Sequence, residues 1–179
     1  MDFIAHLLWS AIIYSDTFLL PQIFLACFCG VLPDLAAFLP SFFSRSARNR
    51  DWRTPEGRQK LLESPQYQQA QKVYNWTHSL VMWGIAIGIG TVIWAIMGGV
   101  VANYPWFLFA GVIHIGIDIP THSKAFFAPA FLTPLSKYRF DGWPWSNKWF
   151  MIVNYTSIVV GILWRLFQYQ FRRKVIFLP

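Results

Sequence analysis

The sequence predicts an all-α membrane protein, a polytopic bundle of four or five transmembrane helices, on the strength of two features. Hydrophobic residues make up 55% of the 179 residues, and only 13% are Asp, Glu, Lys or Arg, against about 25% in a typical soluble domain. The charges are also spread unevenly: residues 73–117 and 149–164 carry none, and residues 17–44 carry only Asp34. Since a spanning helix needs about 20 mainly apolar residues, these stretches are long enough to cross a bilayer.

Five apolar segments follow one another along the chain. They cover residues 3–20, 22–43, 76–101, 107–119 and 149–167. The first is short for a full span, and Pro21 separates it from the second, which Gly30 and Pro33 are expected to interrupt. The third is the clearest span, and the fourth is expected to end at Pro120.

Two polar segments complete a single integral membrane domain of residues 1–179. Residues 44–72 carry six Lys or Arg between positions 45 and 60, which predicts a basic cytoplasmic loop. Residues 123–148 are apolar in part but broken by three prolines, which predicts a re-entrant or interfacial stretch. Five crossings would place the basic loop and the basic C-terminus on opposite faces, whereas the positive-inside rule places both in the cytoplasm. The sequence therefore leaves the number of crossings at four or five.

Histidine and aspartate side chains lie inside or beside the apolar segments. They are His6, His78, His114, His122, Asp34 and Asp118. An ionisable group at membrane depth costs roughly 2.5–3.5 kcal/mol on insertion scales, so something must offset that cost. The aspartates have no Lys or Arg within their own segments. A cation from another segment is one alternative, and a bound metal ion would compensate the carboxylates more directly.

The spacing of these residues favours the metal ion. His114 and Asp118 are four residues apart, so in a helix they lie one turn apart on the same face. Three other segments each contribute one further candidate. The candidate metal ligands are therefore His6, Asp34, His78, His114 and Asp118. Imidazole and carboxylate together suit zinc first, with manganese or iron as alternatives.

Several of these residues have an alternative interpretation to metal binding. Asp34 follows Pro33 and can cap a helix instead of binding metal. His78 stands at the start of a span, where it can simply be solvated. His122 lies beyond the fourth segment and is a candidate for an outer contact or a substrate contact, as are Thr77 and Ser79.

The same residues form motifs that resemble a known family. The motifs are Gly-x-Leu-Pro-Asp at residues 30–34, Thr-His-Ser at 77–79 and His-x-x-x-Asp at 114–118, preceded by His6. They resemble the YdjM-type family of small bacterial inner-membrane proteins, some under LexA control, which are regarded as metal-dependent hydrolases. That family is similar in motif order to zinc phospholipase C and P1-type nucleases. The resemblance implies metal-ligand roles for the five candidate ligands.

The chain departs from the family pattern at two places. The family often has a second acid two residues after Pro-Asp, where this chain has Ala36. It often has His-Arg ahead of Thr-His-Ser, where this chain has Tyr74, Asn75 and Trp76. These departures imply a site with fewer metals, or one that binds metal without turnover.

Together these observations predict a metal-dependent hydrolase, similar to a phosphodiesterase or phospholipase C, in the bacterial inner membrane. The expected substrate is a phosphate ester of a lipid or amphipathic molecule, attacked by metal-activated water, with Asp118 or Asp34 accepting the proton. Membrane lipids are the expected partners. Nucleic acid is not, because the basic clusters adjoin apolar segments. The alternatives are a protein that translocates metal ions or protons, and a non-catalytic membrane scaffold.

Overall fold

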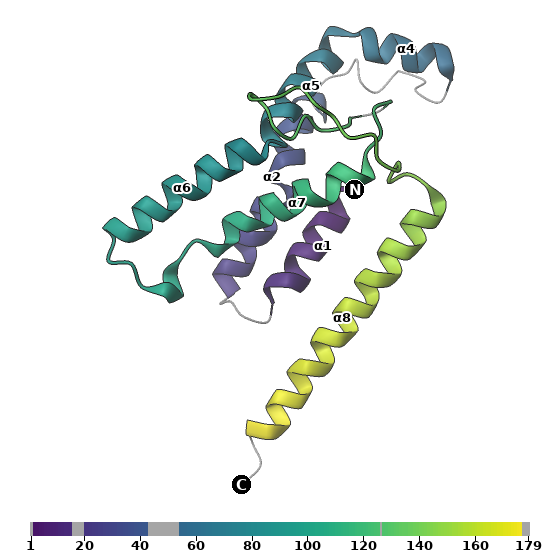
Figure 1. Ribbon diagram of the computed structural model, residues 1–179. Coiled ribbons are helices and arrows are strands. Elements are labelled where there is room, and N and C mark those ends of the chain that lie inside the picture. Colours follow the sequence, from purple (N-terminus) through teal and green to yellow (C-terminus); the bar gives the residue numbers. More distant parts are fainter. Residues whose placement is uncertain (1, 16–19, 43–53, 126, 177–179) are drawn as a thin grey trace.

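The computed structural model describes residues 2–15, 20–42, 54–125 and 127–176, and in these residues the regular structure is helical (Figure 1). The helices are α1 Phe3–Tyr14, α2 Leu20–Phe42, α4 Pro55–Glu63, α5 Pro65–Thr77, α6 Leu80–Ile96, α7 Phe109–Thr121 and α8 Lys148–Ile176. Two short 3₁₀ turns, η1 Val101–Asn103 and η2 Trp106–Leu108, connect α6 to α7. The predicted all-α class is confirmed for this part of the chain.

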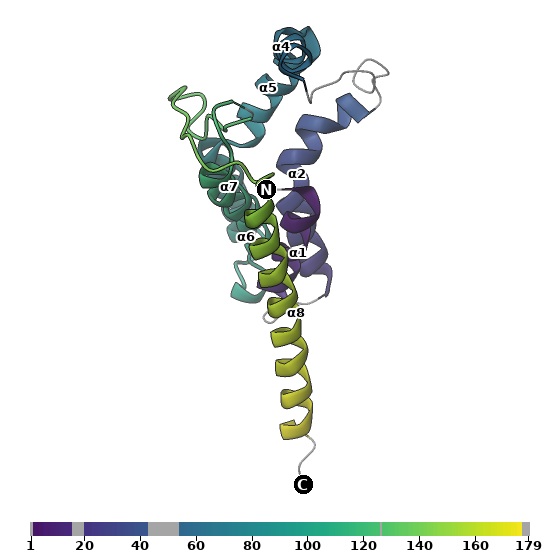
Figure 2. The same ribbon diagram turned by 90° about the vertical axis from the view of Figure 1, so that its right-hand side faces the viewer.

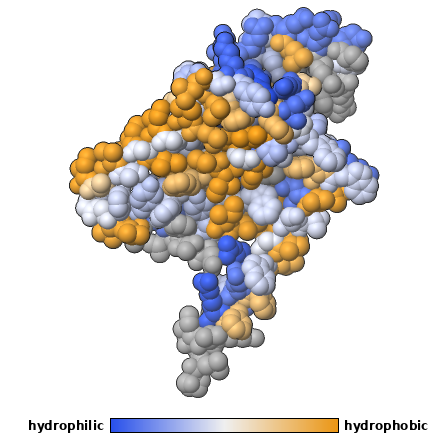
Figure 3. Space-filling model, in the orientation of Figure 1, coloured by the Kyte–Doolittle hydropathy of each residue, from blue (hydrophilic) through white to orange (hydrophobic). Residues whose placement is uncertain are grey.

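Two helices are long and apolar enough to cross a membrane, in the stretches Leu20–Leu39 and Lys148–Arg172. A third candidate is the pair α5 and α6, which is bent by 47° at its break. Helices α1 and α7 are apolar but have only 12 and 13 residues, about 18–20 Å of helix. Side chains of apolar residues cover much of the surface, whereas hydrophilic residues gather around α4 (Figure 3). Membrane-length helices are thus present, in a smaller number than the four or five expected crossings.

Helix α2 lies at the centre of the bundle and packs against α1, α5 and α7, while α8 packs against α1. Figures 1 and 2 both place α4 at one end of the molecule and the C-terminal end of α8 at the other. Lys60 and Arg172, one from each basic cluster, therefore lie far apart along the bundle. If α8 crosses a bilayer, Lys60 and Arg172 lie on opposite faces of it.

Two prolines that were predicted to interrupt or end a helix lie inside one. Helix α2 runs without a break through Pro33, and α7 includes Pro120 and ends one residue later at Thr121. A proline removes one helical hydrogen bond but need not end a helix that is held by packing on its other faces. Pro21 does stand where it was expected, in the first turn of α2, where the missing N–H costs nothing.

The predicted basic loop is partly helical. From residue 54 onward it forms α4 and most of α5, while residues 44–53, with four of the six basic side chains, lie outside the described residues. In the proline-rich stretch after α7, the described residues 122–125 and 127–147 form no helix. It is held to the end of α7 by three backbone hydrogen bonds of 2.8 Å, among them Gly142 N to His122 O.

Candidate metal centre

Three helices and the break between two others bring the predicted ligands together in the interior of the bundle. Helix α1 supplies His6, α2 supplies Asp34, the break between α5 and α6 supplies His78, and α7 supplies His114 and Asp118. All five side chains are buried, and the most exposed of them, Asp34, shows 8% of its surface. A chain of 179 residues thus gathers five ionisable groups at one point, which requires strong mutual compensation.

Four of these side chains offer ligand atoms that all lie within 4.8 Å of one another. They are Asp34, His78, His114 and Asp118. The Nε2 atoms of His78 and His114 are 3.0 Å apart. His78 Nε2 lies 3.4 Å from Asp34 Oδ1, and His114 Nε2 lies 3.2 Å from Asp118 Oδ2. Two imidazole nitrogens and two carboxylate oxygens are a common ligand set for a transition metal.

The backbone determines which nitrogen of each imidazole faces the centre. His78 Nδ1 lies 3.1 Å from the carbonyl oxygen of Tyr74, and His114 Nδ1 lies 2.6 Å from that of Gly30. A carbonyl oxygen only accepts hydrogen bonds, so Nδ1 is the donor in both rings. In a neutral imidazole, Nε2 then carries a lone pair, which is the arrangement found in most metal-binding histidines.

This arrangement leaves the four converging atoms as acceptors. With both imidazoles neutral, the two Nε2 lone pairs point toward each other and toward carboxylate oxygens. Four acceptors in a buried space repel one another unless a cation lies between them. The donor chemistry therefore fits a divalent metal ion, and the ion-pair partners of Asp34 among the described residues are His78 and His114 themselves.

The carboxylate of Asp118 links the four-atom cluster to its surroundings. Its Oδ2 faces His78 and His114, at 3.4 and 3.2 Å. Its Oδ1 lies 3.0 Å from His6 Nε2 and 3.5 Å from His122 Nδ1. His6, a predicted ligand, is not one of the four converging side chains but lies beside them: it contacts the other oxygen of Asp118, and its ring stacks on that of His114 with centroids 3.6 Å apart.

The remaining candidates occupy different places. His122 lies against Asp118, and its Nδ1 donates to the Asp118 carbonyl oxygen at 3.2 Å. Burial lowers the pKa of His122 to about 4, so its ring is neutral at pH 7. Thr77 Oγ1 lies 3.2 Å from His78 Nδ1, next to the centre. Ser79 points away from it: its hydroxyl caps α6 by accepting from Met82 N and donates to the Thr133 carbonyl.

Close helix packing sets the distance between His78 and His114. The Trp83 ring of α6 lies over Gly111 of α7, where an added Cβ would come within 2.5 Å of Trp83 Cε2. Trp83 Nε1 also donates to Thr77 O at 2.9 Å, which ties the ring to the α5–α6 break. Only glycine fits at position 111, and its absence of a side chain lets the two histidine-bearing segments approach each other.

Sequence reasoning did not single out Tyr74 as a member of the site. This side chain is fully buried, stacks on His78 with ring centroids 3.6 Å apart, and its hydroxyl donates to Asp118 Oδ2 at 3.4 Å. Its position in the sequence offered one signal. It lies four residues before His78, one helical turn away, so a helix through residue 77 places the Tyr74 carbonyl within reach of the histidine.

The fold and the site define a class: a helical protein with two or three membrane-length helices and a buried His/Asp cluster able to hold a metal ion. No protein-family model, curated protein or solved structure matches the chain. The likeness to the YdjM-type family thus stays a prediction from the four motifs, and the function must be argued from the site.

Proposed function

We propose that this chain is a membrane-embedded, metal-dependent hydrolase of phosphate esters. The observation that carries the proposal is the convergence of Asp34, His78, His114 and Asp118, whose ligand atoms lie within 4.8 Å of one another while both histidine Nδ1 atoms are held by backbone carbonyls. This is a preorganised donor set with its supporting hydrogen bonds already in place.

When bound, a divalent metal lowers the pKa of a water molecule and polarises a phosphoryl oxygen. The two carboxylates would then have different tasks. Asp118 is in contact with His6, His78, His114 and Tyr74, so it is fixed as an orienting ligand. Asp34 has fewer neighbours and is the more exposed of the two. We therefore assign to Asp34 the role of accepting the proton of the attacking water.

The surroundings favour a lipid-like or amphipathic substrate. The centre lies among apolar helices, near the end of the bundle that carries α4 and the proline-rich stretch (Figure 1). At this end Arg139 donates to Asn75 Oδ1 at 3.2 Å, one residue from Tyr74, and supplies positive charge for a phosphate group. The apolar surroundings and the nearby positive charge both agree with a multi-pass inner-membrane protein of the YdjM type with four or five crossings.

A second candidate function is supported by the burial of the site. His78, His114 and Asp118 are at most 1% exposed, as expected for a metal ion that only holds helices together. Such a scaffold would bind metal and would turn nothing over. Metal content alone cannot separate the two functions, so the test must include turnover.

The test compares hydrolysis and metal content in the same detergent-purified samples. Bis(4-nitrophenyl) phosphate and phosphatidylglycerol are offered to wild type, Asp34→Asn and His114→Ala, each reloaded with zinc or manganese. The proposal expects turnover in wild type, a loss of at least about 100-fold in Asp34→Asn with metal retained, and loss of both in His114→Ala. Asp141→Asn is the matched control and should match wild type, because Asp141 is exposed and accepts from Lys124 N through an oxygen that Asn retains. Full metal with no turnover in wild type would favour the scaffold.

A further inference from the structure

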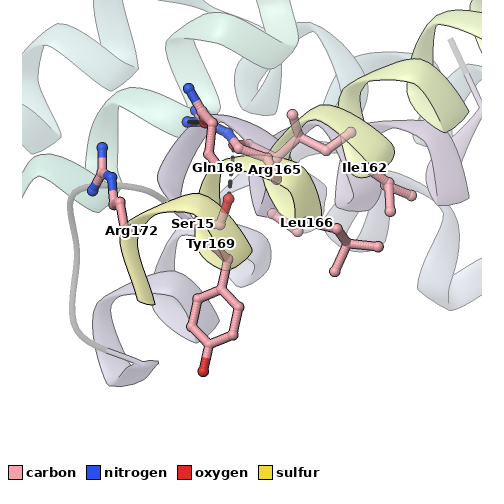
Figure 4. A pocket seen from close by; sticks show the side chains of 9 residues that line it. Ser15, Ile162, Arg165, Leu166, Gln168, Tyr169 and Arg172 are labelled. Atoms are coloured by element: carbon pink, nitrogen blue, oxygen red, sulfur yellow. Dashed lines mark hydrogen bonds between the residues drawn. The ribbon is translucent and has the colours of Figure 1, made fainter. Parts of the chain in front are cut away.

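A second feature lies at the end of the bundle opposite α4, between the last turn of α1 and the second half of α8. It is a groove of about 440 Å³. Among its lining residues are Ile12 of α1 and, on α8, Ile162, Arg165, Leu166, Gln168 and Arg172. Most of its surface is apolar, and its polar groups include two arginines. Figure 4 shows both guanidinium groups projecting from one side of α8.

The position of the groove along α8 places it near a membrane boundary. Helices α1 and α8 run in parallel, since Tyr155 of α8 donates to Asp2 at the start of α1 and Arg165 donates to Ile12 O near its end. Along α8, Arg165 and Arg172 lie about 26 and 36 Å from Lys148. The hydrocarbon core is about 30 Å thick, so the arginines fall on either side of its far boundary when Lys148 lies at the near one.

Aromatic side chains support the same placement. Trp164, Phe167 and Phe171 are more than half exposed in the same part of α8. Trp is enriched at the level of lipid headgroups, so Trp164 carries this argument, and the two phenylalanines extend the apolar surface of the helix. This observation is independent of the two arginines, and it comes from other faces of the helix.

The chemistry of the groove matches one end of an anionic phospholipid. Arg165 and Arg172 are seven residues apart, two turns along the same face. Arg165 is oriented by Nε donating to Ile12 O at 2.9 Å and Nη1 donating to Gln168 Oε1 at 3.0 Å. A guanidinium has five N–H donors and binds phosphate in a planar fork. Ile12, Ile162 and Leu166 supply an apolar wall on which acyl chains can lie.

We propose that this groove binds an anionic phospholipid, with its phosphate between Arg165 and Arg172 and its chains along α1 and α8. The lipid fills the groove between the last turn of α1 and the second half of α8 and fixes α8 against the bundle. This inference is independent of the metal centre, which lies toward the other end of α1. It requires only that α8 crosses a membrane.

The test is lipid binding to the full-length protein, purified in a neutral detergent, by native mass spectrometry and thermal unfolding. Phosphatidylglycerol is the anionic probe, phosphatidylcholine the zwitterionic one, and soluble glycerol 3-phosphate the headgroup without chains. The proposal expects phosphatidylglycerol to bind in preference to phosphatidylcholine and to raise the unfolding temperature. Glycerol 3-phosphate should do neither, because it lacks the chains that the apolar wall takes up.

The variants identify the groove as the place of binding. Arg172→Gln should weaken phosphatidylglycerol binding about fivefold, and Arg165→Gln with Arg172→Gln about 25-fold. Arg165→Lys keeps the charge but not the fork, which guards against a folding defect from loss of the contact with Ile12, and should weaken binding by less than fivefold. Lys124→Gln with Lys137→Gln removes the same charge from exposed positions elsewhere and should bind like wild type.

Three results would overturn the proposal. Equal binding of phosphatidylglycerol and phosphatidylcholine would show that charge plays no part. An equal loss in the control pair would show attraction to net charge rather than to this groove. Stabilisation by glycerol 3-phosphate as strong as that by the lipid would identify the occupant as a soluble phosphate compound.

Discussion

Replacing Gly30 by alanine tests whether the close approach of α1 and α2 builds the metal centre. Gly30 of α2 faces Ser10 of α1, and an added Cβ would lie 3.0 Å from Ser10 Cβ and closer still to its hydroxyl. Ser10 is buried, and its hydroxyl donates to His6 O at 2.9 Å. The Gly30 carbonyl holds His114 Nδ1. A shift at this contact therefore moves His6 and the His114 partner together.

The expected loss of stability follows from the 3.0 Å between the added Cβ and Ser10 Cβ. Carbon atoms pack best at about 3.5–4.0 Å, so the helices must separate by roughly 0.5–1 Å. Overpacking of this kind costs about 1–3 kcal/mol, and the helix propensity of alanine returns about 0.5–1 kcal/mol of it. The net loss of about 0.5–2 kcal/mol should lower the unfolding temperature by a few degrees. Metal affinity should fall about tenfold, because the hydrogen bond that orients His114 is displaced.

The assay is zinc affinity, measured by competition with a chromophoric chelator, together with thermal unfolding in detergent. Adding Ser10→Gly to Gly30→Ala removes the obstructing side chain and should restore metal affinity, even though a second helix glycine costs about 1 kcal/mol of stability. Ser10→Gly alone serves as the control. Wild-type zinc affinity in Gly30→Ala, or no recovery in the double variant, would refute the reasoning.

Three further predictions test other parts of the site. Tyr74→Phe removes the hydrogen bond to Asp118 while keeping the ring stacked on His78, so zinc affinity should fall about tenfold with little change in helical circular dichroism; an unchanged affinity would contradict a positioning role. Gly111→Ala forces the added Cβ against the Trp83 ring and should destabilise the protein by about 1–3 kcal/mol in thermal unfolding, and a stable variant would show that the α6–α7 contact is loose. Removal of metal by a chelator should lower the unfolding temperature, since metal at about 100 times its dissociation constant contributes about 2.7 kcal/mol, and identical melting with and without chelator would contradict a metal bound to the folded state.

The sequence predicted the composition of the site better than its arrangement. Because the long apolar segments contain almost no charged residues, the histidines and aspartates within them could be recognised as candidate ligands. The structure does bring the five predicted ligands together. Periodicity within a segment placed His114 and Asp118 on one face. It could not show that His6 lies beside the four-atom cluster rather than in it, because that depends on how α1 is placed relative to α7 in the bundle.

Backbone groups and neutral side chains were beyond the reach of sequence reasoning. Residue type does not indicate which backbone carbonyl, here that of Gly30, contacts a histidine. It also does not distinguish Tyr74 from other aromatic residues next to a spanning segment. The break between α5 and α6 shows the same limit. An apolar run starting at residue 76 predicted one span from there, whereas Ser79 caps a new helix at Leu80, and the resulting bend points His78 into the bundle.

The most direct test of the central claim is the metal content of the purified protein by mass spectrometry. We expect about one zinc, manganese or iron ion per chain in wild type, and little or none in His114→Ala and Asp118→Asn variants that keep their helical circular dichroism. No metal in wild type after reloading and gentle purification, or the same content in the folded variants, would contradict it.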